Sequence, residues 1–142
     1  MMLYPSYVIS QRLVRGFLGQ ALLTGWLMAT WDLYLDPQMV HEGYWVWFNQ
    51  NGEHTMNIPL SNFIGWFACA TVLALGMAVI DKNVQHLASI KVPAALVMWV
   101  WIGGIVLNAG WFDPFLNRPT VAVLGFLGMG LVLFPAQRVL WK

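Results

Sequence analysis

The chain has 142 residues, of which 59% are hydrophobic and 9% are charged, and its formal net charge is +1. Its mean hydropathy of +0.63 lies far above the average for soluble proteins, and the near-neutral charge argues against a nucleic-acid-binding surface. The single cysteine, Cys69, lies in an apolar run, which excludes a disulfide framework and a metal-finger pattern. Length and composition therefore predict one transmembrane domain, residues 1–142.

Four apolar runs are close to the ~20 residues that a ~30 Å hydrocarbon core requires. They cover about residues 13–31, 59–80, 92–111 and 119–134. The last run could continue to Leu140 through a kink at Pro135. Because the runs are continuous rather than alternating, they predict helices and exclude a barrel. The predicted fold is an all-α integral membrane protein with four transmembrane helices.

The placement of charges predicts how these helices are oriented. If the four spans cross consecutively, one side holds the basic residues Arg12, Arg15, Lys82, Lys91, Arg138 and Lys142, and only Arg118 lies opposite. The other side holds the acidic residues Asp32, Asp36, Glu42, Glu53 and Asp113. The positive-inside rule then places both termini and the loop 81–91 in the cytoplasm. We expect a multi-pass protein of the cell membrane.

The long connection between the first two spans, residues 32–58, is the predicted functional loop on the non-cytoplasmic side. Pro37 disfavours helical geometry at Asp36, so the first helix is expected to end there. Asp36-Pro37 followed by Gly43 predicts a short separate helix with Asp36 as its N-cap. The alternating, Trp-rich segment around Asn51-Gly52 predicts a small hairpin at the membrane surface.

Asp32 and Asp36 are candidate catalytic acids because they lie one turn apart at a predicted helix C-terminus. Mutual repulsion, the negative end of the helix dipole and partial burial all disfavour ionising both. A carboxyl group that stays protonated near neutral pH is what a general acid needs. The alternative is structural: Asp36 is an N-cap and Asp32 is a hydrated interfacial residue.

Tryptophans surround these acids in the sequence. Trp26, Trp31, Trp45, Trp47, Trp66 and Trp111 are candidate substrate-binding residues. Aromatic faces beside a proton donor can hold an apolar chain and stabilise a carbocation, although tryptophans at the headgroup level also serve as membrane anchors. Asn62, which with Ser61 is a candidate N-cap of the second helix, is included among the candidate binding residues.

Other chemistries lack a signature. The histidines show no metal-ligand spacing on a predicted helix, so no metal site is expected. A phosphate loop, a nucleophile elbow and a dinucleotide fingerprint are also absent from the sequence. We therefore expect neither a metal nor a cofactor.

Small residues recur along the later spans, at Gly65 and Cys69, at Gly103 and Gly104, and at Gly125, Gly128 and Gly130. Such residues let helices approach closely in lipid. Tight packing is the plain interpretation, and an elongated slot for a flat ligand is the alternative.

Three segments carry a resemblance to a known family. They are Trp31-Asp-Leu-Tyr-Leu-Asp-Pro-Gln-Met-Val, Gly43-Tyr-Trp-Val-Trp and Ile58-Pro-Leu-Ser-Asn-Phe-Ile-Gly-Trp. Together they resemble the carotenoid biosynthesis membrane-protein family, whose characterised members are hydratases acting on bisanhydrobacterioruberin or gamma-carotene. The resemblance is most specific over residues 26–80, and after Lys82 it rests on Trp111-Phe-Asp-Pro and on hydropathy.

The resemblance implies an all-helical membrane fold and the addition of water across the terminal double bond of an acyclic carotenoid end. Combined with the residues, it suggests that protonated Asp32 or Asp36 delivers the proton, while Asp113 or Glu42 orients the water as base. Hydration is redox-neutral, so no cofactor is needed.

Two further expectations follow from the resemblance. Family members are usually longer, with further helices upstream, so the chain is expected to be either the C-terminal part of a longer protein or a shortened relative. The alternative function is a non-catalytic carotenoid- or pigment-binding subunit that packs beside other membrane proteins or copies of itself.

Overall fold

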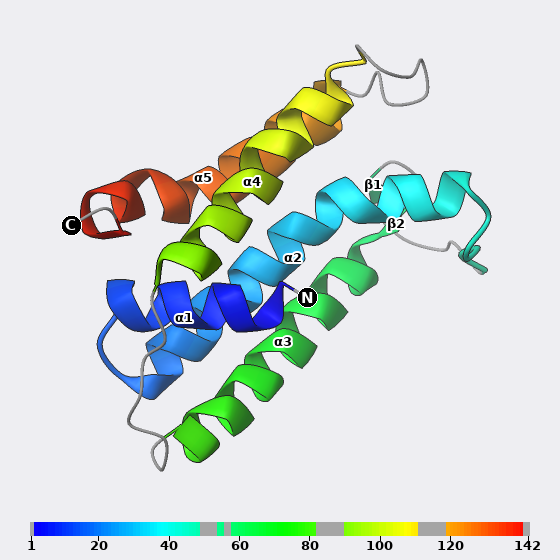
Figure 1. Ribbon diagram of the computed structural model, residues 1–142. Helices are drawn as coiled ribbons and strands as arrows, with labels where there is room; N and C mark the ends of the chain where they lie inside the picture. Colours follow the sequence, from blue (N-terminus) through cyan, green and yellow to red (C-terminus); the bar gives the residue numbers. More distant parts are fainter. Residues whose placement is uncertain (1, 49–53, 56–57, 82–89, 111–118, 141–142) are drawn as a thin grey trace.

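The computed structural model describes residues 2–48, 54–55, 58–81, 90–110 and 119–140. These residues form five helices: α1 (Leu3–Leu13), α2 (Phe17–His41), α3 (Leu60–Asp81), α4 (Lys91–Asn108) and α5 (Pro119–Leu140) (Figure 1). A minimal antiparallel ladder joins β1 (His54–Thr55) to β2 (Ile58–Pro59), with Thr55 opposite Ile58. The described part of the chain is therefore predominantly helical, which confirms the predicted all-α class.

The helices are arranged around α2, which contacts each of the other four. Helices α2 to α5 alternate in direction, and α1 lies across them (Figure 1). On either side of α2 lie α3 and the pair formed by α4 and α5. The central position of α2 means that its side chains face several neighbours at once.

Within the described part of the chain, three helices are long and apolar enough to cross a membrane, namely Leu60–Ile80, Lys91–Asn108 and Pro119–Arg138. They match the predicted second, third and fourth spans, and α5 continues through Pro135 to Leu140. The predicted first span, 13–31, corresponds to the first part of α2, which begins only at Phe17. Helix α2 is not one of the three candidate spans, because polar residues along it lower its hydropathy.

Helix α1 was not predicted from the sequence. Its residues Pro5–Ser10 are all buried, and the hydroxyl of Thr24 on α2 donates a hydrogen bond to Ser10 Oγ at 3.2 Å. With 11 residues the helix is about 16 Å long, too short to cross a hydrocarbon core. Packing against α2, α4 and α5 therefore stabilises a segment that lacks an apolar run.

The predicted break at Pro37 is wrong. Helix α2 continues through Pro37 to His41, so Asp36 is inside the helix and is not the N-cap of a separate short helix. A proline inside a helix loses one backbone hydrogen bond, and here both Pro37 and the preceding Asp36 are buried. The chain leaves α2 through Gly43, which has a positive φ of 72°.

The predicted hairpin around Asn51-Gly52 lies outside the described residues. The ladder that the structure does describe, between β1 and β2, directly precedes α3. Helix α3 begins at Leu60, so Ser61 and Asn62 lie in its first turn and neither is its N-cap.

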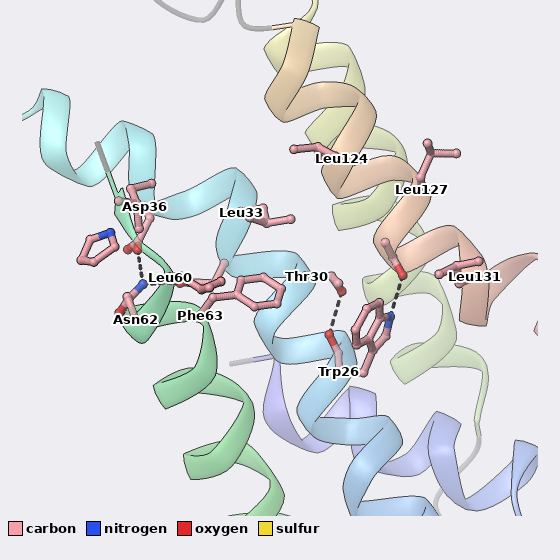
Figure 2. Close-up of a pocket in the computed structure, with 14 residues that line it drawn as sticks. Trp26, Thr30, Leu33, Asp36, Leu60, Asn62, Phe63, Leu124, Leu127 and Leu131 are labelled. Atoms are coloured by element: carbon pink, nitrogen blue, oxygen red, sulfur yellow. Dashed lines mark hydrogen bonds between the residues drawn. The ribbon is translucent and has the colours of Figure 1, made fainter. Parts of the chain in front are cut away.

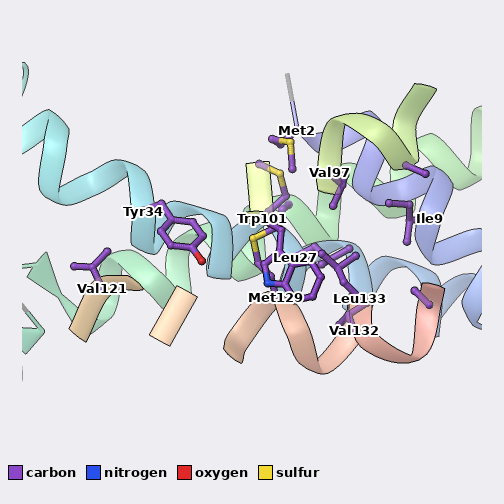
Figure 3. Packing of buried hydrophobic residues seen from close by; sticks show 14 residues of the cluster. Met2, Ile9, Leu27, Tyr34, Val97, Trp101, Val121, Met129, Val132 and Leu133 are labelled. Carbon is purple, nitrogen blue, oxygen red and sulfur yellow. The ribbon is translucent and has the colours of Figure 1, made fainter. Parts of the chain in front are cut away.

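The main hydrophobic core lies where α1, α2, α4 and α5 meet (Figure 3). Trp101 of α4 stacks on Phe126 of α5 at a centroid distance of 4.8 Å and contacts Phe134 edge-to-face at 4.9 Å. Its indole N–H donates to the Phe126 carbonyl oxygen at 2.9 Å. A buried tryptophan with a satisfied N–H thus joins α4 to α5.

Two glycines let α2 approach this pair of helices. The ring of Tyr34 lies against Gly104 of α4 and Gly125 of α5, where an added Cβ would come within 2.5 Å of the ring at either position. The predicted close packing is therefore confirmed at these two glycines. A Cβ at Gly65 or Gly103 would meet no atom within 4 Å.

Replacing Gly104 with alanine should destabilise the protein, because the added methyl group would overlap Tyr34. Overpacking of this kind costs about 1–3 kcal/mol. Gly103→Ala is a matched control on the same helix with open space at the added Cβ, and both variants gain similar helix propensity. Thermal unfolding in detergent measures the difference. Equal midpoints for the two variants would contradict the close contact.

Candidate functional site

A cleft of about 400 Å³ lies between α2, α3 and α5 (Figure 2). Its lining residues are Trp26, Thr30, Asp32, Leu33, Asp36, Ile58, Pro59, Leu60, Asn62, Phe63, Leu124, Leu127, Gly128 and Leu131. Helix α2 supplies the floor, and α3 and α5 supply the walls. The lining is apolar except at the end that holds the two carboxyl groups.

The α5 wall is formed by leucines at positions 124, 127 and 131, which share one face of the helix by their spacing. All three are exposed, by 42%, 54% and 71% respectively. Exposed leucines along one side mean that the cleft opens laterally onto the apolar surface of the helices. A lipid-dissolved molecule could therefore enter it from the side.

Close contact between α2 and α5 fixes the other end of the cleft. The indole N–H of Trp26 donates to the carbonyl oxygen of Gly128 at 2.8 Å. The hydroxyl of Thr30 donates to the Trp26 carbonyl oxygen at 2.8 Å, and a Cβ at Gly128 would lie 2.7 Å from Thr30 Cγ2. The Trp26 ring is thereby held in one orientation as part of the lining.

Two aspartates and one asparagine form the polar end of the cleft. Asp32 and Asp36 are 2% and 1% exposed. The Asn62 side-chain amide donates to Asp32 Oδ2 at 3.1 Å and to Asp36 Oδ2 (Figure 2). One NH2 group carries two hydrogens, so a single asparagine from α3 joins both carboxyl groups of α2.

This environment favours the protonated state. Burial is the largest cause that raises the pKa of Asp32, and the neighbouring Asp36 charge raises it further. Burial also raises the pKa of Asp36. Both residues lie beyond the first predicted span, 13–31, and at the level of the first turn of α3. Two carboxyl groups this close do not both ionise readily, so the pair retains a proton at higher pH than isolated aspartates.

Each carboxyl group also keeps a free oxygen. Asp32 Oδ1 and Asp36 Oδ1 are buried and receive no hydrogen bond from the part of the chain that the structure describes. Buried polar atoms normally have a partner. Since both aspartates line the cleft, these two unpaired oxygens lie at its polar end, and either of them can carry the proton of the pair.

The structure brings four of the candidate residues from the sequence into this cleft, namely Trp26, Asp32, Asp36 and Asn62. Other candidates are located elsewhere. Trp31 lines a second cavity of about 190 Å³ between α2 and α4. Glu42 is exposed at the end of α2.

The remaining tryptophans are placed as follows. Trp45 and Trp66 are each 36% exposed, Trp47 is partly buried, and none of these three lines the cleft. Asp113 and Trp111 lie outside the described residues. The tryptophan wall predicted from the sequence is thus represented in the cleft by Trp26.

Sequence reasoning missed most of the apolar lining, including Leu33, Phe63 and the α5 leucines. The leucine spacing on α5 was a visible signal for a shared face, but it does not reveal which helix that face meets. Within the described ranges, no three His, Cys, Asp or Glu side chains come together as a metal-binding group.

Comparisons with known proteins identify the family of the chain and nothing further. Searches of curated proteins and of solved structures gave no significant match. A family model described as "carotenoid biosynthesis protein" matches residues 1–132, a range that includes the cleft and all of its lining. The chain therefore belongs to the carotenoid biosynthesis protein family.

Proposed function

We propose that the protein is a hydratase that adds water to the terminal double bond of an acyclic carotenoid end group. The observation that carries this proposal is the buried pair of Asp32 and Asp36 at the polar end of an otherwise apolar cleft. A long hydrocarbon can place its end beside the acids while the rest of the chain stays in the surrounding lipid.

The cleft suits the end of such a molecule rather than its whole length. From Trp26 to Asp36 the floor of the cleft extends about 15 Å along α2. Exposed leucines of α5 continue the apolar surface outward. The substrate is therefore bound by burial of apolar area, and the acid pair is the polar group that contacts its terminus.

Acid catalysis accounts for the reaction. A protonated carboxyl group donates its proton to the terminal double bond and leaves a tertiary cation on the carbon that carries two methyl groups. The Trp26 ring lies at the other end of the same cleft, where it would contact the hydrocarbon part of the substrate. Water then adds to the cation and loses a proton, so the pair of carboxyl groups is restored without an oxidant or a reductant.

We also propose a membrane topology for the chain. Helix α2 would be the first of four crossings in the cell membrane, since α2 to α5 alternate in direction (Figure 1). Arg15, Lys91 and Arg138 border the ends of α2, α4 and α5 that would then face the cytoplasm. The acid pair would lie at the opposite edge, where water can reach it.

Asp32→Asn and Asp36→Asn should each abolish hydration while leaving the fold intact, because asparagine keeps the size of the side chain but cannot carry the acidic proton. General acid catalysis contributes about 10²–10⁴-fold, so a loss of at least about 100-fold is expected. Expression in a lycopene-producing host with mass analysis of the carotenoids measures the hydrated product.

Ser61→Ala, at an exposed neighbour of Asn62, serves as the control and should retain activity. Hydrated carotenoid from both asparagine variants at the level of the control would contradict the proposal. Stoichiometric pigment bound to the unaltered protein, with no hydrated product, would instead favour the binding-subunit function.

The hydration rate should fall as the pH is raised. The raised pKa values mean that the pair holds its proton at low pH and loses it as the pH passes through those values. Among the described residues that line the cleft from β2, α3 and α5, none is titratable. The alkaline limb in vesicles therefore reports on Asp32 and Asp36. A rate that rises steadily into the alkaline range would exclude a carboxyl proton donor.

Filling the cleft should impair substrate binding without altering the acids. Leu127→Trp places a large ring on the α5 wall and should weaken binding by about tenfold or more, equivalent to ~1.4 kcal/mol. Val123→Trp is the matched control, because Val123 is similarly exposed on α5 but does not line the cleft. Titration of carotenoid into detergent-solubilised protein measures both affinities. Equal affinities would argue against substrate binding in this cleft.

A further inference from the structure

The two carboxyl groups of the site occupy different positions along the cleft. Asp32 lies one helical turn closer to Thr30 and to the apolar part of the lining. Asp36 lies toward the β2 end of the cleft, beside Asn62 and Leu60 (Figure 2). An apolar substrate end that enters between α3 and α5 would therefore approach Asp32, whereas water from the loop side would reach Asp36.

We propose that Asp32 is the proton donor, that Asp36 is the base which binds the attacking water, and that Asn62 is the positioning residue that holds both carboxyl groups. This inference rests on the hydratase function proposed above. It places the base inside the cleft, one turn from the acid, and leaves exposed Glu42 without a role in the reaction.

The unpaired Oδ1 atom of each aspartate suits one of the two proposed roles, proton donor for Asp32 and base for Asp36. With its proton on Oδ1, Asp32 presents an O–H to the double bond, because its Oδ2 is already engaged by Asn62. Asp36 Oδ1 is likewise unengaged, and it can accept a hydrogen bond from a water molecule. A bound water needs two to four polar partners, and the two aspartates at this end of the cleft provide them.

Electrostatics supports the same division. Burial raises the pKa of both carboxyl groups, and the neighbouring charge of Asp36 raises that of Asp32 further. We place the proton of the pair on Asp32, because it is the carboxyl group nearer the apolar part of the lining. The carboxylate that remains on Asp36 is the form that a base requires.

The reaction then balances. The O–H bond of Asp32 breaks as the π electrons form a new C–H bond at the terminal CH carbon, which leaves the cation on the dimethyl carbon. The water oxygen forms the C–O bond, and Asp36 takes one proton from it. That proton then returns from Asp36 to the neighbouring Asp32, whose carboxyl group is bound by the same Asn62 amide. The net change is the addition of one water.

Hydration in D2O tests the two roles separately. Membranes containing the protein are supplied with lycopene in D2O, and both the product and the recovered lycopene are analysed for deuterium by mass spectrometry. Asp32→Asn should give neither product nor deuterated lycopene, because no cation forms. Asp36→Asn should lose product by at least about 100-fold yet return deuterated lycopene, since Asp32 still protonates the double bond and then takes a proton back.

The outcomes are distinguishable. Deuterated lycopene from Asp32→Asn but not from Asp36→Asn would reverse the assignment, and identical behaviour of the two variants would overturn it. An unaltered protein that gives no hydrated product would instead refute the proposed function itself. Should an asparagine variant fail to fold, as judged by thermal unfolding in detergent, Asp32→Ser and Asp36→Ser give the same comparison with smaller side chains.

Asn62 is tested through the pH profile. Its hydrogen bond lowers the pKa of Asp32, so Asn62→Leu should shift the alkaline limb of the hydration rate to higher pH, and Asn62→Gln should restore part of the shift. Ser61→Ala should leave the profile unchanged. A uniform loss of activity at every pH in Asn62→Leu would show that Asn62 has only a structural role.

Discussion

The hydrogen bonds from the Asn62 amide to two buried carboxyl groups are the constraint on which the site depends. Two unit charges 4 Å apart repel by about 4 kcal/mol at an effective dielectric constant of about 20, and burial adds to the cost of ionising both. Two features lower this cost. The Asn62 amide of α3 donates a hydrogen bond to each carboxyl group, and the pair retains a proton. Under the proposed topology, removing charge in this way would leave an acid at the edge of the membrane, where an ionised pair would be unfavourable.

The same stretch of α2 builds both the site and its support. Asp32 and Asp36 face α3 and the cleft, while Tyr34 between them in the sequence faces α4 and α5. The glycines at positions 104 and 125 let α4 and α5 pack closely around that ring. Because α3 packs on the other side of α2, α3 and α5 leave the cleft open between them. The position of the cleft thus follows from helix geometry: side chains four residues apart on α2 share one side, and the side chain midway between them points to the opposite side.

The apolar helices could be predicted from the sequence, but the contacts between them could not. Hydropathy predicted α3, α4 and α5 to within a few residues because continuous apolar runs of spanning length have few other structures. It missed α1, whose burial depends on neighbours distant in the sequence. The rule that a proline ends a helix failed at Pro37, because α2 continues to His41 although the proline can donate no backbone hydrogen bond. The acids were found from their spacing, but their link to Asn62 spans 26 and 30 residues and could not be inferred from local pattern.

Infrared spectroscopy of the purified protein in lipid tests the central claim most directly. A carboxyl group that keeps its proton near neutral pH has a C=O stretching band distinct from that of a carboxylate, and it shifts when the solvent is exchanged for D2O. We predict such a band near pH 7 in the unaltered protein, its loss in Asp32→Asn, and its disappearance as the pH is raised. A spectrum near pH 7 that contains only ionised carboxylate bands would contradict the account.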